Sequence, residues 1–458
     1  MNQIKESIFR AYDIRGIVET DLQDDVVVHI ASAFAKLFHN TGKKKVIIGI
    51  DGRPSSPHIK KILIDTMMYY GIDILDIGLV PTPVMYYAIT CREPVHGIMI
   101  TASHNPAEYN GFKAVVNGEP QTENQVKEIY KIAKQGNFPA PSQGSLNQEN
   151  ILEDYFSAVI NHIKPTRKVK VVVDAGNGTT GITAPRLYQK LGAEVCELYC
   201  NVDGTFPNHY PDPTKIKNLS DLQKRVADVN ADLGLAFDGD GDRISVVTPN
   251  GNILWGDQIT TLFVKDILSK HPGATVISEV KASQQLFDRV KACGGVPIMW
   301  KTGYTYIKQK MKEHGAVLGG EMSGHIFFND RWFGFDDAVY TGARLIELIA
   351  KSNQTLDLIV AKLPNVYNTP EIRVETTEES KFEIVSQLTA HFKKKFPIID
   401  IDGVRVTFPH GWAVVRVSNT QPTLVIRFEA DSEENLEKIQ HQVMKEIYKI
   451  RDQGMGTI

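Results

Sequence analysis

The sequence has few cysteines, and they form no recognisable pattern. Only four occur among 458 residues: Cys91, Cys196, Cys200 and Cys293. There is no CxxC pair, and no histidine pattern completes a zinc site around the two that stand four residues apart. So few cysteines in so long a chain exclude a disulfide scaffold. We expect them to be reduced, buried side chains in a cytoplasmic protein.

Long apolar runs and excess charge are also missing. No stretch approaches the ~20 apolar residues of a membrane span, and residues 1–10 lack the apolar region of a secretion signal. Lys plus Arg is 51 and Asp plus Glu is 54, which gives a net charge of −3. The chain therefore lacks the positive charge of a typical nucleic-acid binder, and the short basic runs at 43–45 and 393–395 are typical of solvated faces. These absences predict neither a membrane nor a nucleic-acid partner.

The composition is that of an ordinary globular protein, with 42% hydrophobic and 23% charged residues. At 458 residues it has room for about three domains. Short apolar runs alternate with helix-compatible segments such as 57–70 and 184–191, which predicts mainly parallel α/β sheets. The runs are 46–50, 169–173, 233–237 and 275–280, and polar residues follow each one. In such sheets, ligands bind at the carboxyl ends of the strands.

The pattern changes toward the end of the chain. Segments rich in turn-forming residues at 135–150, 248–256 and 363–370 are candidate linkers. Beyond them, the runs 404–408, 413–417 and 423–429 alternate in hydrophobicity like antiparallel strands. A charged amphipathic helix over 433–451 follows. This part of the sequence predicts a smaller α+β domain.

The most informative motif is Asp-Gly-Asp-Gly-Asp-Arg at 238–243. Asp238, Asp240 and Asp242 alternate with glycines that let a loop bend around an ion. Carboxylate oxygens are the ligands that Mg²⁺ and Ca²⁺ prefer. An EF-hand is excluded, because its Gly and Glu positions are Arg243 and Pro249 here. The alternative to a metal loop is an acidic surface turn.

A second motif, Thr-Ala-Ser-His-Asn-Pro at 101–106, follows the apolar run 97–100. Its residue types predict a turn with exposed hydroxyl groups. Ser103 could act as a nucleophile or carry a phosphoryl group, or the segment could be a structural turn. No GxSxG nucleophile elbow is present in the sequence.

Two further motifs suggest phosphate binding. Gly-Asn-Gly-Thr-Thr-Gly at 176–181 is a formal GxGxxG after a strand, with Glu197 about twenty residues on, which keeps an NAD-linked oxidoreductase as an alternative. Arg-Val-Ser-Asn-Thr at 416–420 combines a guanidinium group, two hydroxyls and turn amides, which suits a phosphate cradle. A non-catalytic protein that binds sugar phosphates or nucleic acid is a third hypothesis.

Taken in order, these motifs resemble those of the α-D-phosphohexomutase superfamily, most closely its bacterial phosphomannomutase/phosphoglucomutase branch. The resemblance runs from Tyr-Asp-Ile-Arg-Gly at 12–16 to residues 416–420, and it includes a sugar loop, Gly-Glu-Met-Ser-Gly-His, at 320–325. It implies three related α/β domains with mixed, mainly parallel sheets and a smaller C-terminal α+β domain around a central cleft. The expected domains are 1–147 with the phosphoserine loop, 148–250 with the metal loop, 251–364 with the sugar loop and 365–458 with the phosphate loop.

The resemblance also implies an activity. It is the reversible transfer of a phosphoryl group between O1 and O6 of mannose and glucose phosphates, through a phosphoserine enzyme and a hexose 1,6-bisphosphate intermediate. The implied cofactor is Mg²⁺, the bisphosphate serves as activator, and the implied partners are hexose phosphates. A monomer is expected.

Residue roles follow from the same resemblance. The catalytic residues would be Ser103, Lys113, Arg243 and His325, and the general base could be Lys113 or His325. The metal ligands would be Ser103, Asp238, Asp240 and Asp242. Substrate contacts would come from Tyr12, Arg15, His104, Lys281, Tyr304, Glu321, Ser323, Arg416, Ser418, Asn419 and Thr420. Tyr304 stands where close relatives often have His, which replaces a potential cation with a neutral hydroxyl near pH 7 and leaves the sugar preference open.

Overall fold

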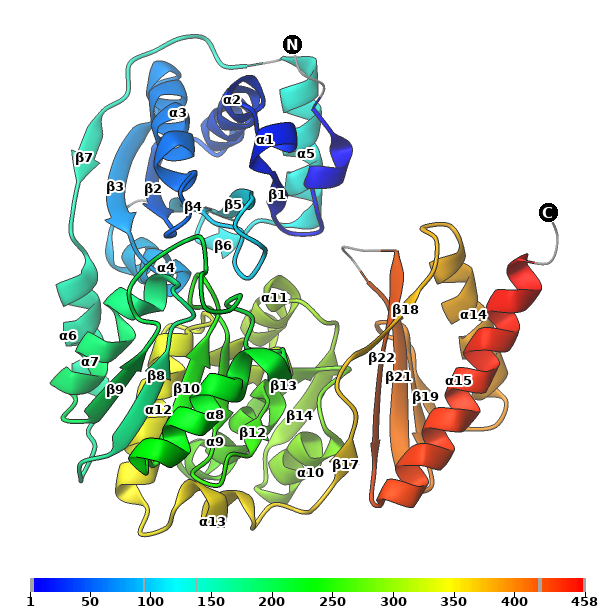
Figure 1. The fold of residues 1–458 in the computed structure, drawn as a ribbon. Coiled ribbons are helices and arrows are strands. Elements are labelled where there is room, and N and C mark those ends of the chain that lie inside the picture. The colour runs from blue at the N-terminus through cyan, green and yellow to red at the C-terminus, as the bar shows by residue number, and fades with distance from the viewer. Residues whose placement is uncertain (1–3, 94, 137, 419–421, 456–458) are drawn as a thin grey trace. The chain divides into compact units, whose positions relative to one another are not determined.

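The computed structural model describes residues 4–93, 95–136, 138–418 and 422–455 (Figure 1). The chain divides into two compact units. Unit 1 comprises Met1–Ile259 and Ser323–Ile359, and unit 2 comprises Thr260–Met322 and Val360–Ile458.

The first sheet of unit 1 carries the serine motif. Its strand order is β1-β5-β4-β2-β3-β7, with β6 added to β5. The strands are β1 (Ile14–Ile17), β2 (Lys45–Ile50), β3 (Asp73–Leu79), β4 (His96–Ile100), β5 (Tyr109–Val116), β6 (Glu119–Pro120) and β7 (Leu146–Gln148). β2 runs parallel to β3 and β4, whereas β5 is antiparallel to β1 and β4. The serine motif begins directly after β4, at the carboxyl end of a central strand.

Helices cover this sheet because their apolar faces need burial. They are η1 (Glu6–Ile8), α1 (Val18–Asp21), α2 (Asp24–Asn40), α3 (Ser56–Tyr69), α4 (Thr82–Cys91) and α5 (Glu123–Gln135). α2 has a buried apolar face, and its Phe34 and Phe38 join the core formed with β2, β4 and β5. The capping box of Thr122 and Gln125 fixes the start of α5.

The second sheet of unit 1 carries the aspartate motif. Its order is β12-β11-β10-β8-β9, from β8 (Lys170–Asp174), β9 (Glu194–Leu198), β10 (Leu233–Phe237), β11 (Ile244–Val247) and β12 (Ile253–Leu254). β8 is parallel to β9 and β10, and β10 is antiparallel to β11. The motif is thus the tight connection between β10 and β11. The remaining elements here are α6 (Leu152–His162), η2 (Thr179–Ile182), α7 (Ala184–Lys190), η3 (Ile216–Leu219), α8 (Ser220–Val229), β16 (Ile326–Phe328), α12 (Ala338–Lys351) and α13 (Leu356–Val360).

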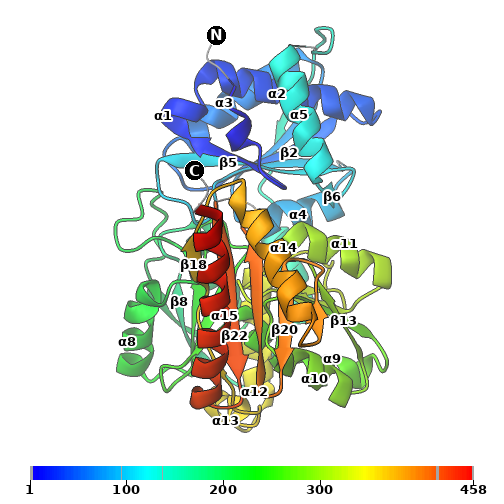
Figure 2. The ribbon, with the colours of Figure 1, turned by 90° about the vertical axis from the view of Figure 1, so that its right-hand side faces the viewer.

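Unit 2 contains one set of parallel strands and one antiparallel sheet. β13 (Thr275–Glu279) is parallel to β14 (Val296–Trp300) and β15 (Leu318–Gly320), with helices α9 (Gly256–Lys270), α10 (Gln284–Ala292) and α11 (Tyr304–His314). The C-terminal sheet has the order β17-β22-β21-β20-β19, with β18 paired to β22. Its strands are β17 (Tyr367–Asn368), β18 (Ile372–Glu375), β19 (Ile398–Ile399), β20 (Val404–Phe408), β21 (Gly411–Val417) and β22 (Thr423–Ala430). Helices α14 (Ser380–Lys393) and α15 (Glu433–Met455) lie against one face of this sheet (Figure 2).

The architecture agrees with the sequence prediction of mixed, mainly parallel α/β sheets followed by an antiparallel α+β region. The run 233–237 is β10 without any shift, and 404–408 is β20. Each predicted linker contains a short strand. Residues 146–148 within 135–150 form β7, which pairs with β3, residues 253–254 within 248–256 form β12, and residues 367–368 within 363–370 form β17. Among the described residues, no helix combines the length and hydropathy that a membrane crossing needs.

All four cysteines are free thiols, but the expectation that they are buried is wrong in part. Cys200 is buried, Cys196 and Cys293 are half-buried, and Cys91 is exposed. Cys91 is the last residue of α4, whose buried residues end at Ala88.

Candidate active site

Ser103 lies in a strained, buried turn. Its φ is 52°, in the left-handed region that few residues other than glycine adopt, and its exposed fraction is 2%. The Ser103 Oγ donates a hydrogen bond of 2.7 Å to Asp238 Oδ2 and lies 3.2 Å from His104 Nδ1. Such strain persists only where surrounding contacts enforce it, and it is concentrated at functional sites. The loop therefore holds a hydroxyl group against the aspartate motif.

The loop after β10 is wrapped around the side chain of Asp238. Its Oδ1 accepts hydrogen bonds from the backbone N–H groups of Gly241, Asp242 and Arg243, at 3.0, 3.1 and 3.1 Å. Gly239 allows close approach to the serine loop, because a Cβ there would lie only 2.4 Å from the carbonyl oxygen of Ser103. The glycines of the aspartate motif therefore allow close contact with the serine loop, in addition to letting their own loop bend.

The three carboxylates of this loop are fully buried, and one lysine neutralises two of them. Lys113, on β5, donates to Asp240 Oδ2 at 2.6 Å and also to Asp242 Oδ2. Burial would raise the pKa of Asp240, but the Lys113 ammonium group holds it below its ordinary value. Burial, together with the neighbouring carboxylates, raises the pKa of Asp238 to about 7. The loop is therefore short of positive charge.

The donor set fits a divalent cation. Ligand oxygens of Asp238, Asp240 and Asp242 lie within 4.8 Å of one another. Within the described part of the chain, the buried Oδ1 atoms of Asp240 and Asp242 have no hydrogen-bond partner. Buried carboxylate oxygens normally have a partner, and a hard cation such as Mg²⁺ would supply it. The geometry therefore agrees with the predicted metal loop and not with an acidic surface turn.

Two arginines bring positive charge to Ser103. Arg243 donates from Nε to Asp238 Oδ2 at 3.0 Å, lies within 3.3 Å of Ser103 Oγ, and donates to His104 Nδ1. Arg15 binds Asp13 and donates to Asn105 Oδ1 at 2.9 Å in the serine loop. Burial and then Arg243 lower the pKa of His104 well below its usual value, so His104 is neutral here. The half-buried Tyr12 begins the same segment as Arg15.

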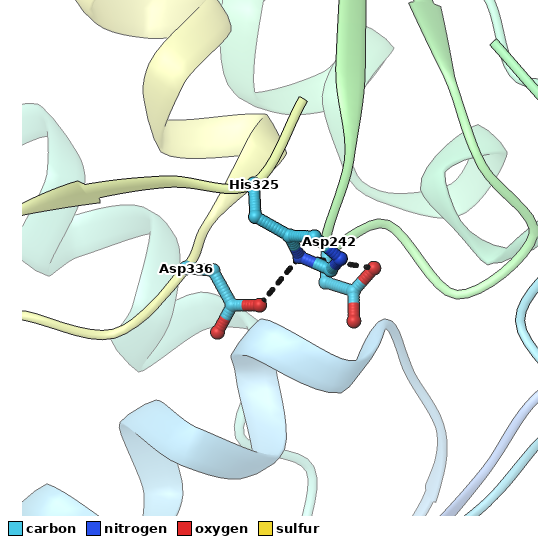
Figure 3. A group of neighbouring side chains, drawn as sticks. All are labelled: Asp242, His325 and Asp336. Atoms are coloured by element: carbon cyan, nitrogen blue, oxygen red, sulfur yellow. Dashed lines mark hydrogen bonds and ion pairs between the residues drawn. The ribbon is translucent and has the colours of Figure 1, made fainter. Parts of the chain in front are cut away.

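His325 lies between two carboxylates (Figure 3). Its Nδ1 is 2.8 Å from Asp336 Oδ2 and 3.8 Å from Asp242 Oδ1. The position follows from local pairing, since His325 precedes β16 and Asp336 forms a bridge with Phe327 of that strand. Ser323 is half-buried two residues earlier, in the turn where Gly324 packs on the backbone of Ile244. His325 thus reaches the aspartate motif.

Unit 2 gathers a second group of predicted site residues at the carboxyl ends of β13, β14 and β15. Lys281 is buried and pairs with Glu371 at 2.5 Å and with Glu279 at 3.5 Å. Glu321 accepts a hydrogen bond from the Gly303 N–H, next to Tyr304. Tyr304 is buried at the first turn of α11.

The predicted phosphate cradle is described in part. Arg416 is buried at the end of β21 and donates from Nε to Asp402 Oδ2 at 3.0 Å. Asp402 also accepts from the Thr302 N–H at 2.9 Å. Ser418 is buried and its N–H donates to Thr423 O. Asn419 and Thr420 lie outside the described residues.

Sequence reasoning missed several residues that hold these groups in place. Thr82 donates to Asp240 Oδ2 at 2.6 Å, and Asp336 holds His325. Arg53 donates to backbone carbonyls of the serine loop at Ser103, Asn105 and Pro106. The only signal in the sequence was Asp51, the polar residue that follows the run 46–50. It pairs with Arg53 at 3.0 Å.

The glycine motif at 176–181 does not form a dinucleotide loop. A short 3₁₀ helix, η2, follows the motif's first residues, and the N–H and Oγ1 of Thr179 both donate to Gly239 O. A Cβ at Gly178 would lie 2.8 Å from the backbone of Gly239. This glycine motif therefore packs against the aspartate loop. The structure does not favour the NAD-linked alternative.

Four profiles of one family match successive parts of the chain. They are described as phosphoglucomutase/phosphomannomutase, alpha/beta/alpha domain I at residues 6–140, domain II at 153–251, domain III at 255–367, and C-terminal domain at 371–446.

The chain belongs to the phosphoglucomutase/phosphomannomutase family.

Curated relatives agree with this assignment. The chain is 47% identical over 434 residues to a phosphomannomutase/phosphoglucomutase of Pseudomonas aeruginosa, which covers 94% of each chain. It is 44% identical over 446 residues to a phosphoglucomutase of Neisseria meningitidis, and this alignment covers 96% of this chain and 97% of the relative. A solved structure of a phosphoglucomutase/phosphomannomutase family protein from Burkholderia thailandensis has a TM-score of 0.93 at 41% identity, over 98% of both chains.

These findings confirm the predicted superfamily, the fold class and the mutase activity. The chain is an enzyme that transfers phosphoryl groups, as the serine and aspartate loops indicated. Neither a non-catalytic binding protein nor an oxidoreductase fits the match along the whole chain.

Proposed function

We propose that this chain interconverts the 1-phosphates and 6-phosphates of mannose and glucose through a phosphoserine at Ser103. The observation that carries the proposal is the position of Ser103 Oγ, which lies 2.7 Å from Asp238 and 3.3 Å from Arg243. A hydroxyl group beside a cation-binding loop and a guanidinium group suits the negative charge of a phosphoryl group.

The metal-binding part of the proposal rests on the oxygen donors described above. Asp238, Asp240 and Asp242, with an oxygen at Ser103, would hold Mg²⁺. When bound, this ion would neutralise charge on the phosphoryl oxygens. Arg243 would supply further neutralisation, because it already reaches Ser103 Oγ and has a raised pKa owing to the surrounding carboxylates, despite its burial.

The reaction needs two phosphoryl transfers. In the first, the O6 hydroxyl of a hexose 1-phosphate attacks phosphorus, the bond from phosphorus to Ser103 Oγ breaks, and the O6 proton passes to a base. In the second, Ser103 Oγ attacks the phosphorus on O1 of the hexose 1,6-bisphosphate, the bond from phosphorus to O1 breaks, and O1 takes the proton held by the base, which leaves the hexose 6-phosphate. Such transfers depend mainly on alignment and charge neutralisation.

Of the two candidate bases, we favour His325. Its Nδ1 hydrogen bond to Asp336 assigns the ring proton to Nδ1, so Nε2 carries the lone pair that accepts a proton. Lys113 instead donates to two carboxylates, which favours its charged form. Lys113 then acts as a fixed positive charge.

Sugar and distal phosphate contacts complete the proposal. Glu321 and Ser323 would bind sugar hydroxyls, with Tyr304 donating a neutral hydrogen bond nearby. Arg416 and Ser418, together with Asn419 and Thr420, would bind the phosphate that is not transferred. The remaining proposed substrate contacts are Tyr12, Arg15, His104 and Lys281.

The domain division and the assembly state are part of the same proposal. The family matches at 6–140, 153–251, 255–367 and 371–446 support domains at 1–147, 148–250, 251–364 and 365–458. Four free thiols agree with a reducing, cytoplasmic compartment. We propose a monomer.

A coupled assay tests the function. Mannose 1-phosphate or glucose 1-phosphate is supplied with Mg²⁺ and a trace of the bisphosphate, and the 6-phosphate is measured. We expect turnover of both sugars and a mass increase of one phosphoryl group that maps to Ser103. Ser103→Ala should lose both, while its circular dichroism stays that of the parent chain. Turnover by Ser103→Ala at the parental rate would refute the phosphoserine role.

A further inference from the structure

Arg53 is hydrogen-bonded to the backbone of the serine loop. Its side chain is completely buried, and its guanidinium group donates four hydrogen bonds to backbone carbonyls, three in the serine loop and one at Tyr109, the first residue of β5. NH2 donates to Ser103 O at 3.0 Å and to Asn105 O at 2.7 Å, while NH1 donates to Pro106 O at 2.6 Å and to Tyr109 O at 2.9 Å.

The guanidinium group is itself held from two sides. Asp51 accepts from Arg53 Nε at 3.0 Å and from its backbone N–H at 3.1 Å, and it also accepts from Ser56 Oγ. The ring of Phe206 covers the guanidinium group, with 5.2 Å from Cζ to the ring centroid. Gly204 packs on the Arg53 backbone, where an added Cβ would lie 2.4 Å from the Arg53 Cα. The orientation of Arg53 is therefore fixed by groups outside the serine loop.

We propose that Arg53 is a positioning residue for phosphoryl transfer: with Asp51 and Phe206 it fixes the serine-loop backbone so that Ser103 Oγ stays aligned between Asp238 and Arg243. One of its acceptors is the carbonyl of Ser103 itself, the residue in the left-handed conformation. The same carbonyl faces Gly239 of the aspartate loop, so Arg53 sets the separation of the two loops. Arginine is required because a planar fork with five N–H donors can reach four carbonyls and a carboxylate, whereas lysine offers three donors from one atom.

This inference rests on the proposed function, since it concerns the alignment of the residue that would carry the phosphoryl group. A displacement of about 1 Å at a reacting group can cost on the order of 10²-fold in rate. Arg53 donates to the loop backbone and Ser103 carries the reacting oxygen, so the effect should fall on kcat more than on KM.

The test compares Arg53→Lys with Arg344→Lys. Arg344 is a matched control: it is 2% exposed, pairs with Asp330 at 2.8 Å, and lies over the ring of Phe328, but it is on α12 and outside the serine loop. We expect Arg53→Lys to lower kcat by about 10²-fold, with KM for the hexose phosphate changed by less than about threefold. Arg344→Lys should keep kcat within about threefold of the parent chain.

Two results would overturn the proposal. One is a kcat for Arg53→Lys within a few-fold of the parent chain, and the other is an equal loss of kcat in both lysine variants. If Arg53→Lys does not fold, Asp51→Asn takes its place, and an unchanged kcat in that variant has the same meaning. The parent chain separates the two proposals: if it lacks phosphoserine and turnover, the proposed function fails, whereas an active parent with unaffected variants refutes only the positioning role.

Discussion

Replacing Asp238 by Asn should change how stability depends on pH. The pKa of this carboxyl group is about 7 in the folded chain, against an ordinary value of 3.8, because burial and the neighbouring Asp242 and Asp240 carboxylates disfavour its charged form. That difference corresponds to about 4 kcal/mol of free energy of unfolding. Since the folded pKa is raised, this stabilisation is fully present below roughly pH 4 and is lost as the pH rises through about 7.

Asparagine does not titrate, so Asp238→Asn removes the decrease in stability that the parent chain shows as the pH rises. We expect the free energy of unfolding of Asp238→Asn, relative to the parent chain, to rise by about 3 kcal/mol between roughly pH 5 and pH 8. The variant should also lose its catalytic activity.

Urea unfolding of both chains in EDTA, at several pH values, measures this effect. EDTA is needed because a bound cation would stabilise the ionised carboxylate and hide the titration. An exposed aspartate, Asp228, provides the control substitution Asp228→Asn, for which we expect no change of slope. A constant difference between Asp238→Asn and the parent chain across this pH range would refute the electrostatic reasoning.

Three further substitutions test the other parts of the site. Gly239→Ala should lower kcat by about 10²-fold with unchanged circular dichroism, because the added Cβ would lie 2.4 Å from Ser103 O. A kcat equal to that of the parent chain would show that close contact between the two loops is not needed for turnover. Lys113→Met should lower the free energy of unfolding in EDTA by about 3–5 kcal/mol, because two buried carboxylates lose their counter-charge. Added Mg²⁺ should restore part of that loss, and equal losses with and without Mg²⁺ would argue against a cation site. Arg416→Ala should raise KM for hexose phosphates and slow turnover in the coupled assay, and unchanged kinetics would exclude it from phosphate binding.

The sequence predicted best those features that are local. The runs 46–50 and 233–237 are strands because a continuous apolar stretch is readable from neighbouring residues. The carboxylates at 238, 240 and 242 form one group for the same reason: their spacing within one loop brings them together. A pattern of a few residues determines these features.

Contacts between distant segments could not be read in this way. Lys113 and Asp240 are 127 positions apart, and Ser103 and Asp238 are 135 apart, so no spacing rule joins them. The resemblance to a known family supplied their roles instead. The contacts between Arg53 and the serine loop could not be predicted either, because their acceptors are backbone carbonyls, which every residue carries.

The pairing of strands in the C-terminal sheet has a consequence for the order of folding. β19 pairs with β20, β20 with β21 and β21 with β22, so each strand bonds to its neighbour in the sequence. The sheet and its helices also have a hydrophobic core of their own, from Val374 to Ile450. Short loops close at low entropic cost, whereas the parallel sheets of unit 1 need crossover connections before their strands can pair. We expect pulse-labelling hydrogen exchange during refolding to detect protected amides in β20–β22 before those in β8 and β10.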